Sequence, residues 1–446
     1  MESSHRTKGL LRLTMACNER CPFCNVPVED YPEPTPAEEA SMRELDEFVA
    51  SGEGTLTISG GEPTLLRKRL VRLVVAARAR GIANVEVQTN AVLVTPDYAR
   101  ELANAGVTSA FVSLLSHVGT HHDALAGLEG AFDKCLAGID NMLDAGIEVT
   151  LNPVVARRTQ ALLPGYFRFV ANRLPRVRAV SLSAVQPHGR AARDLDLLPD
   201  YDVLGPKVIE ALGVAEARGI RVLNPYCGLP ACVGWDDALD RSVEAIEARA
   251  GGWRATPGLE NTGDKVHGPP CRRCTFRPVC GGAWRAYWEV RGGAGIASPS
   301  VLVEPWEGQG MDQAVVRGFG APVAEALAAA TTPTVWYWTD RLSPGDAALP
   351  FTHLALELNA ARLDVNQLKH LRAIAGRPVH VALRVGNDPL DLGAMLQVLS
   401  GLGVTTVVLV GPPQWAPMEV ALRAAFPKLD VRRVDPPPRG ASPGAA

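Results

Sequence analysis

Apolar residues follow two alternating patterns through the N-terminal half of the chain. Short runs rich in β-branched residues alternate with longer stretches in which apolar residues recur at helical spacing, which predicts strands alternating with helices. The predicted strands are Leu10–Thr14, Thr55–Ser59, Val85–Thr89, Ala110–Leu115, Glu148–Val154 and Ala179–Ala184, with a further candidate at Arg221–Asn224. The predicted helices between them are Pro36–Val49, Leu66–Arg80, Pro96–Ala105, Gly130–Ala145 and Leu204–Arg218. Six repeated units of this kind predict an α/β fold whose parallel sheet forms an open or partial barrel.

A second pattern of strands and helices begins after the glycine-rich segment Gly292–Gly295. Its predicted strands are Thr334–Trp338, His353–Glu357, Val379–Arg384 and Thr405–Val410, and its predicted helices are Val365–Ile374, Leu390–Leu402 and Met418–Ala425. The expected segments are a barrel at 1–220, a cysteine-rich region at 221–292, a linker at 293–333, a small α/β domain at 334–435 and a disordered tail at 436–446. The small domain carries no phosphate loop or nucleophile signature, so we expect it to have a structural or partner-binding role.

Composition narrows the class of protein. A chain of 446 residues predicts roughly two or three domains. Its 47% hydrophobic and 21% charged residues are typical of a soluble globular protein. The net charge of -3 gives no broad attraction for nucleic acid. No stretch approaches the ~20 apolar residues of a membrane span, and the N-terminus lacks the apolar run of a signal peptide. We therefore expect a cytoplasmic protein with no membrane partner.

The nine cysteines are the most informative residues. In a reducing compartment their spacing points to metal ligation or catalysis rather than to disulfides. Cys17, Cys21 and Cys24 directly follow the first predicted strand. A 4Fe-4S cluster held by three thiolates keeps one iron open, which is the feature of a catalytic metal site. A zinc knuckle would need a fourth ligand nearby, but none follows until His117, and only His5 precedes.

The spacing Cys-x3-Cys-x2-Cys, with the aromatic Phe23 before the last cysteine, resembles the signature of the radical S-adenosylmethionine superfamily. The resemblance implies a 4Fe-4S cluster on Cys17, Cys21 and Cys24, to which S-adenosyl-L-methionine is chelated. It also implies an electron donor such as flavodoxin or ferredoxin. Reductive cleavage would then yield a 5′-deoxyadenosyl radical that takes a hydrogen atom from a substrate carbon.

A second motif, Gly60-Gly61-Glu62-Pro63, follows the second predicted strand. Glycines allow a bulky ligand to approach the backbone, and a carboxylate suits an ammonium group. In the family that this chain resembles, the Gly-Gly-Glu-Pro element binds the methionine amino group, so these four residues are expected to bind the cofactor.

Further cofactor contacts are implied by the resemblance at the ends of later strands. Thr89, Asn90, Ser113 and Asn152 stand where similar enzymes place contacts to the ribose or carboxylate, although each could instead satisfy the local backbone. The stretch His117–Asp123 could provide substrate contacts or a proton acceptor, but a solvated polar loop is the favoured interpretation.

A second group of cysteines lies beyond the predicted barrel: Cys227 and Cys232, followed by Cys271, Cys274 and Cys280 in the spacing Cys-x2-Cys-x5-Cys. It resembles the cysteine-rich extension called SPASM, or its shorter form twitch, which holds auxiliary iron-sulfur clusters. No cysteine follows the last member, so we expect one auxiliary cluster, with structural zinc as the alternative. The candidate metal ligands are Cys227, Cys232, Cys271, Cys274 and Cys280. The ninth cysteine, Cys135, stands alone in a predicted helix and is expected to be buried.

The substrate is open at this stage. Extensions of this type accompany maturases of ribosomally made peptides, which makes a peptide the leading expectation, although no leader-peptide module is evident in the roughly nine residues before the first strand. The alternatives are oxidation or rearrangement of a small metabolite or sugar, and a non-catalytic iron-sulfur or zinc protein. RNA modification would require a basic surface near the cluster loops. The best candidates there, Arg157 and Arg158, are two adjacent arginines, which more often mark a solvated helix start, so this function is disfavoured.

Overall fold

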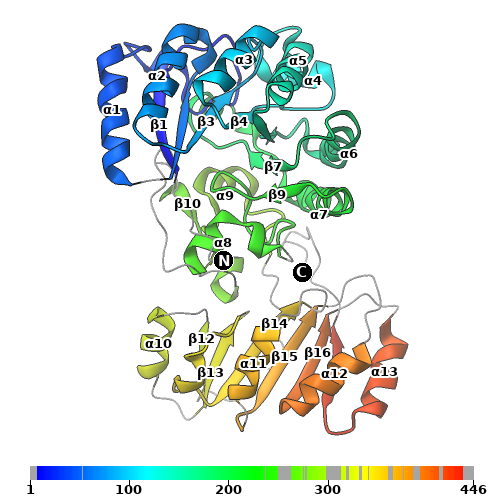
Figure 1. The fold of residues 1–446 in the computed structure, drawn as a ribbon. Helices are drawn as coiled ribbons and strands as arrows, with labels where there is room; N and C mark the ends of the chain where they lie inside the picture. Colours follow the sequence, from blue (N-terminus) through cyan, green and yellow to red (C-terminus); the bar gives the residue numbers. More distant parts are fainter. Residues whose placement is uncertain are drawn as a thin grey trace. The chain divides into compact units, whose positions relative to one another are not determined.

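The protein has two compact units, each with its own parallel sheet (Figure 1). The computed structural model describes residues 8–52, 54–236, 238–249, 263–274, 276, 279–297, 313–317, 321–330, 334–339, 341–359, 365–374, 376–384, 392–410 and 415–434. The first unit comprises Met1–Ile246, Trp253–Val266 and Ala283–Gly295. The second comprises Glu247–Gly252, His267–Gly282 and Ile296–Ala446. Residues 221–292, expected as one cysteine-rich region, are therefore divided between both units.

The first unit is built on a seven-stranded parallel sheet in which the strands follow one another in chain order. Its strands are β1 (Lys8–Thr14), β2 (Thr55–Gly60), β3 (Asn84–Thr89), β4 (Ser109–Val112), β5 (Glu148–Leu151), β7 (Ala179–Ser181) and β9 (Arg221–Leu223). The helices are α1 (Glu38–Ser51), α2 (Arg67–Ala79), α3 (Pro96–Ala105), α4 (Gly119–Ala126), α5 (Ala131–Asp144), α6 (Leu163–Arg173), α7 (Tyr201–Ala217) and α9 (Arg285–Arg291). The boundary of the unit falls within α8 (Val243–Arg249), after Ile246. Because all the strands are parallel, their carboxyl ends lie at one edge of the sheet, where the loops of the candidate site begin.

Helix α3 shows how local sequence sets these elements. Thr95 precedes it, and its Oγ1 accepts a hydrogen bond from the backbone N–H of Tyr98, while Pro96 occupies the first turn. Gly106 ends the helix in the left-handed conformation. Tyr98 and Leu102 face the core and are buried. These signals are all local, and the predicted bounds of this helix are confirmed.

The predicted strand Glu148–Val154 is interrupted in the structure. It forms β5 and the short strand β6 (Val154–Val155), which pairs with β8 (Ser183–Ala184) in a separate two-stranded sheet. The break falls at Asn152 and Pro153, and Pro153 has no N–H to donate to a ladder. Asn152 therefore stands at the carboxyl end of β5, where a site residue was expected.

The stretch His117–Asp123 is not the solvated loop that was favoured, because α4 begins within it. His122 is buried, and its Nδ1 accepts a hydrogen bond from the N–H of Leu115. Asp123 accepts hydrogen bonds from the backbone N–H groups of Gly130 and Phe132 at the start of α5. Both side chains therefore have structural partners in the fold.

The second unit contains a six-stranded parallel sheet, again in chain order. Its strands are β12 (Gln313–Arg317), β13 (Thr334–Thr339), β14 (His353–Asn359), β15 (Val379–Arg384), β16 (Val404–Val410) and β17 (Asp430–Val434). Its helices are α10 (Ala321–Ala328), α11 (Val365–Ala373), α12 (Leu392–Gly401) and α13 (Ala416–Ala425). The range expected as a linker, 293–333, contains β12 and α10, so this sheet begins earlier than expected. The tail at 436–446 lies outside the described residues.

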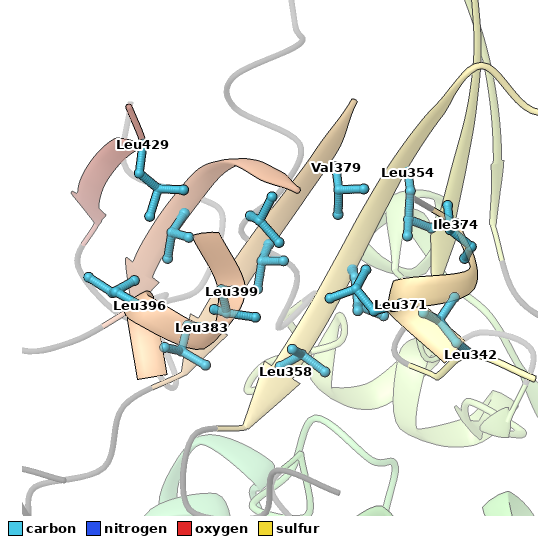
Figure 2. Close-up of a cluster of buried hydrophobic side chains, with 14 of the residues drawn as sticks. Leu342, Leu354, Leu358, Leu371, Ile374, Val379, Leu383, Leu396, Leu399 and Leu429 are labelled. Carbon is cyan, nitrogen blue, oxygen red and sulfur yellow. The ribbon is translucent and has the colours of Figure 1, made fainter. Parts of the chain in front are cut away.

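Helices of the second unit cover one face of its sheet with a core of mostly aliphatic side chains. Side chains of a strand alternate between faces, and in β13 Val335 and Tyr337 join the large core, whereas Trp336 and Trp338 join a smaller cluster. Figure 2 shows part of the large core, to which α11 contributes Leu371 and α12 contributes Leu396 and Leu399. Among the described residues of the whole chain, no helix is long and apolar enough to cross a membrane.

Candidate active site

The loop after β1 brings three thiols to one cavity. Cys17, Cys21 and Cys24 line a cavity of about 160 Å³ together with residues from the ends of β2, β3 and β4. The backbone N–H of Cys24 donates to the carbonyl of Cys21 at 3.2 Å, which folds the second half of the loop into a turn. The N–H of Glu19 donates to Cys17 Sγ at 3.4 Å. The loop thus points its thiols toward the carboxyl edge of the sheet.

Burial disfavours ionisation of these thiols when no cation is bound to them. It raises the pKa of Cys17 to about 11, raises the pKa of Cys21 well above its ordinary value, and raises the pKa of Cys24 as well. Thiolates in such a place need a cation close by, and iron in a cluster provides one. The three-thiol donor set and the cavity therefore fit a 4Fe-4S cluster. Among the residues that the structure describes, no three His, Cys, Asp or Glu side chains converge on a position for a single metal ion.

Gly60 and Gly61 allow the loops after β1 and β2 to touch. Gly60 has φ +133°, and a Cβ at either glycine would collide with backbone oxygens of the β1 end, at Thr14 and Ala16. The N–H of Gly61 donates to the carbonyl of Thr14 at 2.6 Å, and the N–H of Glu62 donates to the carbonyl of Ala16 at 2.8 Å. Both glycines line the cavity, so they serve the packing of the protein's own backbone as well as the approach of a ligand.

The carboxylate of Glu62 is held by four donors from the protein. Its Oε1 accepts hydrogen bonds from the N–H of Thr64 at 2.9 Å, from Thr64 Oγ1 at 2.6 Å and from Thr89 Oγ1 at 2.8 Å. Its Oε2 accepts one from the N–H of Asn90 at 2.7 Å. Burial raises the pKa of this carboxyl group, while these hydrogen bonds oppose the rise. Glu62 therefore ties the Gly-Gly-Glu-Pro turn to the end of β3, and neither it nor Pro63 is among the described residues that line the cavity.

The other predicted contacts divide into two groups. Thr89, Asn90 and Ser113 line the cavity with the thiols. Asn152 is not among the described lining residues, and its Oδ1 accepts a hydrogen bond from Ser183 Oγ at 2.7 Å. Ser183 Oγ also lies 3.3 Å from Cys227 Sγ, which links two predicted site residues through a third.

Three charged residues of the cavity, Glu19, Arg20 and Arg190, were not predicted from the sequence. Glu19 is buried between Cys17 and Cys21, and burial raises its pKa to about 7. A carboxylate between two ligand cysteines was a signal that could have identified it. Arg190 also lines the cavity, but nothing in its local sequence indicates that it would reach a loop 166 residues earlier.

The remaining candidate metal ligands are carried by both units. Cys227 and Cys232 belong to the first unit. There Lys265 Nζ and Glu244 Oε1 form a buried ion pair at 2.7 Å, and both charges interact with the Cys227 thiol. In the second unit Cys271, Cys274 and Cys280 are buried, and the N–H of Gly282 donates to Cys280 Sγ at 3.4 Å. Burial raises the pKa of Cys274 to about 12.

The ninth cysteine, Cys135, lies in α5 and is fully buried, as predicted.

Comparison with known proteins agrees with this geometry. The family model described as "Radical SAM superfamily" matches residues 11–159. The chain is 30% identical over 333 residues to an Fe-coproporphyrin III synthase of Methanosarcina barkeri, which covers 62% of this chain and 83% of that protein. It is 27% identical over 352 residues to a PqqA peptide cyclase of Granulibacter bethesdensis, covering 70% of this chain and 92% of that protein.

A further relative matches over a shorter span. An AdoMet-dependent heme synthase of Nitratidesulfovibrio vulgaris is 30% identical over 184 residues, or 40% of this chain, and the chain spans about half of its length, 48%. The matched families are enzymes that use a 4Fe-4S cluster and S-adenosylmethionine. From the thiol-lined cavity, the family match and the relative matched over 83% of its length, the chain belongs to the radical S-adenosylmethionine superfamily.

Proposed function

We propose that Cys17, Cys21 and Cys24 bind a 4Fe-4S cluster and that S-adenosylmethionine binds beside it in the same cavity. The observation that carries the proposal is the meeting of these thiols with Gly60 and Gly61 in one cavity at the carboxyl edge of a parallel sheet. When bound, the two groups supply an electron and a 5′-deoxyadenosyl radical that abstracts a hydrogen atom from the substrate. The electron comes from an external one-electron reductant such as flavodoxin or ferredoxin.

Residues of the protein are proposed to bind the cofactor and to fix its orientation. The backbone at Gly60 and Gly61 forms part of the cavity wall, on which the methionine part of the cofactor would lie, and Glu62 keeps that wall in place through Thr64, Thr89 and Asn90. Three polar side chains, Thr89, Asn90 and Ser113, face the cavity and are proposed to hydrogen-bond the cofactor. Asn152, which is bonded to Ser183, then acts next to the cavity rather than within it.

The candidate cysteines of the second unit, Cys271, Cys274 and Cys280, are proposed to bind an auxiliary iron-sulfur cluster, with structural zinc as the alternative. The similarity to the PqqA peptide cyclase supports a peptide-modifying enzyme with a cysteine-rich extension of this kind. A metal count that finds iron beyond the first cluster supports the auxiliary cluster, and one equivalent of zinc supports the alternative.

Two substrate classes have support from the relatives. A ribosomally made peptide is supported by the PqqA peptide cyclase, and a tetrapyrrole is supported by the Fe-coproporphyrin III synthase and the heme synthase. The second belongs to the small-metabolite alternative, and the relative matched at 30% identity over 83% of its length favours it. Deuterium transfer from a labelled substrate into 5′-deoxyadenosine distinguishes the two classes.

The first test is anaerobic reconstitution with iron and sulfide, followed by dithionite and S-adenosylmethionine. Wild type is expected to form 5′-deoxyadenosine, whereas Cys24→Ala is expected to form none and to lose about four irons per chain. Failure of reconstituted wild type to bind S-adenosylmethionine would overturn the proposal.

A further inference from the structure

The segment after β8 contacts the cysteine loop, although 166 positions of the chain separate Arg190 from Cys24. Arg190 lies in a short 3-10 helix, η4 (Gly189–Arg193). Its Nη1 donates to the carbonyl oxygen of Cys21 at 3.1 Å. Its Nε and Nη2 donate to the two carboxylate oxygens of Glu29 at 2.7 Å and 2.6 Å. One guanidinium therefore joins two points of the loop that carries the thiols.

The backbone of the same segment contacts the loop at the next thiol. The N–H of Arg190 donates to the carbonyl of Cys24 at 2.9 Å. Gly189 has φ +56°, and a Cβ there would collide with the same carbonyl oxygen, so only glycine allows this approach. Arg190 thus binds Cys21, Cys24 and Glu29, and Gly189 allows the close approach.

The cysteine loop depends on such contacts because it has no secondary structure of its own over the thiols. No helix or strand is present between the end of β1 and the 3-10 helix η1 (Val28–Asp30), a described stretch that includes all three cysteines. Glu29 lies within η1. A guanidinium bound to a carboxylate through two parallel hydrogen bonds fixes both partners in orientation as well as distance. The hydrogen bonds from Arg190 lower the pKa of Glu29 to about 2, so this carboxyl group is ionised at neutral pH.

The segment that carries Arg190 is anchored on its other side. His188 Nε2 pairs with Asp264 Oδ2 at 2.9 Å, and its ring meets the Trp284 ring edge-on with centroids 5.1 Å apart. Trp284 and Lys265 are paired in the antiparallel hairpin of β10 (Lys265–Val266) and β11 (Ala283–Trp284). These contacts hold the segment from which the guanidinium reaches out.

We infer that Arg190 is a positioning residue for the cluster, which acts by fixing the loop of Cys21 and Cys24 through its paired contact with Glu29. The inference rests on the proposed function, since it assumes that these thiols hold the cluster. Arg190 acts on the cluster through the loop, whose carbonyl groups at Cys21 and Cys24 it binds.

A matched control exists within the same unit. Arg72 binds Glu38 through Nε and Nη2 at 2.7 Å and 2.7 Å, the same bidentate arrangement, but it joins α2 to α1. Arg72→Gln therefore removes a pair of equal geometry without touching the thiol loop. Arg190→Gln and Glu29→Gln remove the bidentate pair between Arg190 and Glu29. Arg190→Lys keeps the positive charge but loses the planar guanidinium that binds both carboxylate oxygens.

The test begins with the full chain stripped of metal, in which the alkylation rates of Cys21 and Cys24 are measured by mass spectrometry. Glu29→Gln, which keeps the Arg190 charge near the thiols, is expected to raise these rates about tenfold, in keeping with the loss of charge-assisted hydrogen bonds. Arg190→Gln is expected to raise them less, because loss of the guanidinium also disfavours the Cys24 thiolate. Arg190→Lys is expected to fall between wild type and Arg190→Gln, and Arg72→Gln to match wild type. Equal rates in Glu29→Gln and wild type would overturn the inference.

Reconstituted protein provides the second readout. The electron paramagnetic resonance spectrum of the reduced cluster, with and without S-adenosylmethionine, is expected to change in Arg190→Gln but not in Arg72→Gln. Unchanged spectra with full iron content would again overturn the positioning role. If wild type itself forms no cluster, the proposed function fails, while the alkylation rates still decide whether Arg190 fixes the loop.

Discussion

The two parallel sheets of this protein share a topology and differ in what their strands present. Both run in chain order, with seven strands in the first unit and six in the second. In the first, the strands β1 to β4 lead into cysteines, glycines and short polar residues that line a common cavity. In the second, alternate strand residues pack under four helices as a continuous aliphatic core. The winding of the chain therefore does not determine chemistry, and the residues at the strand ends do.

The comparison predicts its largest effect at the thiols of the first unit. Cys21→Ala is expected to abolish 5′-deoxyadenosine formation, because two thiolates do not hold the cluster. Cys135→Ala is the control, since Cys135 is buried in α5 of the same unit and is not expected to bind metal. Quantified 5′-deoxyadenosine and iron in both variants check the prediction, and a Cys21→Ala protein with full iron would contradict it.

A core substitution in the second sheet should change stability. Leu356 in β14 is fully buried in the large core, and Leu356→Ala is expected to lower the free energy of unfolding by about 3 kcal/mol. Val420→Ala, at an exposed position of α13, should have little effect. Chemical denaturation followed by circular dichroism measures both, and equal midpoints in the two variants would show that this core is less well packed than the contacts indicate.

Each unit also contains a histidine kept neutral by burial. Burial lowers the pKa of His122 in the first unit and of His380 in the second to about 4, below the ordinary 6.5. As the pH falls, the unfolded chain binds the proton first, so stability is full above about pH 6.5 and declines toward about pH 4. The full shift at His122 corresponds to about 3 kcal/mol as an upper value.

Denaturation at a series of pH values tests this contribution. His122→Gln is expected to flatten the decline of the first unit between about pH 6.5 and about pH 4. An unchanged slope in the variant would mean that His122 takes up no proton on unfolding in this range.

The smallest predicted effect concerns Glu62, whose side chain joins the Gly-Gly-Glu-Pro turn to the end of β3. Glu62→Gln replaces one carboxylate oxygen by an NH2 group that faces a donor, so one buried hydrogen bond is lost, at a cost of about 2 kcal/mol. We expect a rise of about tenfold in the concentration of S-adenosylmethionine needed for half-maximal binding. Equilibrium binding to reconstituted protein is the measurement, and wild-type affinity would indicate that the cavity wall does not depend on this carboxylate.

Elements with strong local signals were predicted well, and those formed by burial were not. The bounds of α3 and β15 match the predictions, because capping residues mark α3 and a short apolar run with alternating valines marks β15. Helix α6 was missed because Pro164 and Gly165 weaken its local signal, and buried side chains such as Phe167 stabilise it in the fold. The short elements β12 and α10 were predicted to be part of a linker, because the apolar residues of neither segment show a clear helical or strand period.

The sequence by itself determined the thiol spacing, the glycine turn and the alternation of strands with helices, since each depends on residues close together in the chain. Only the tertiary structure decided that Glu62 accepts hydrogen bonds from the end of β3 and that Arg190 binds the loop of Cys21 and Cys24. These contacts join residues 28 and 169 positions apart. No local pattern encodes them, because the free energy that places such side chains comes from burial and hydrogen bonding between segments that are far apart in the chain.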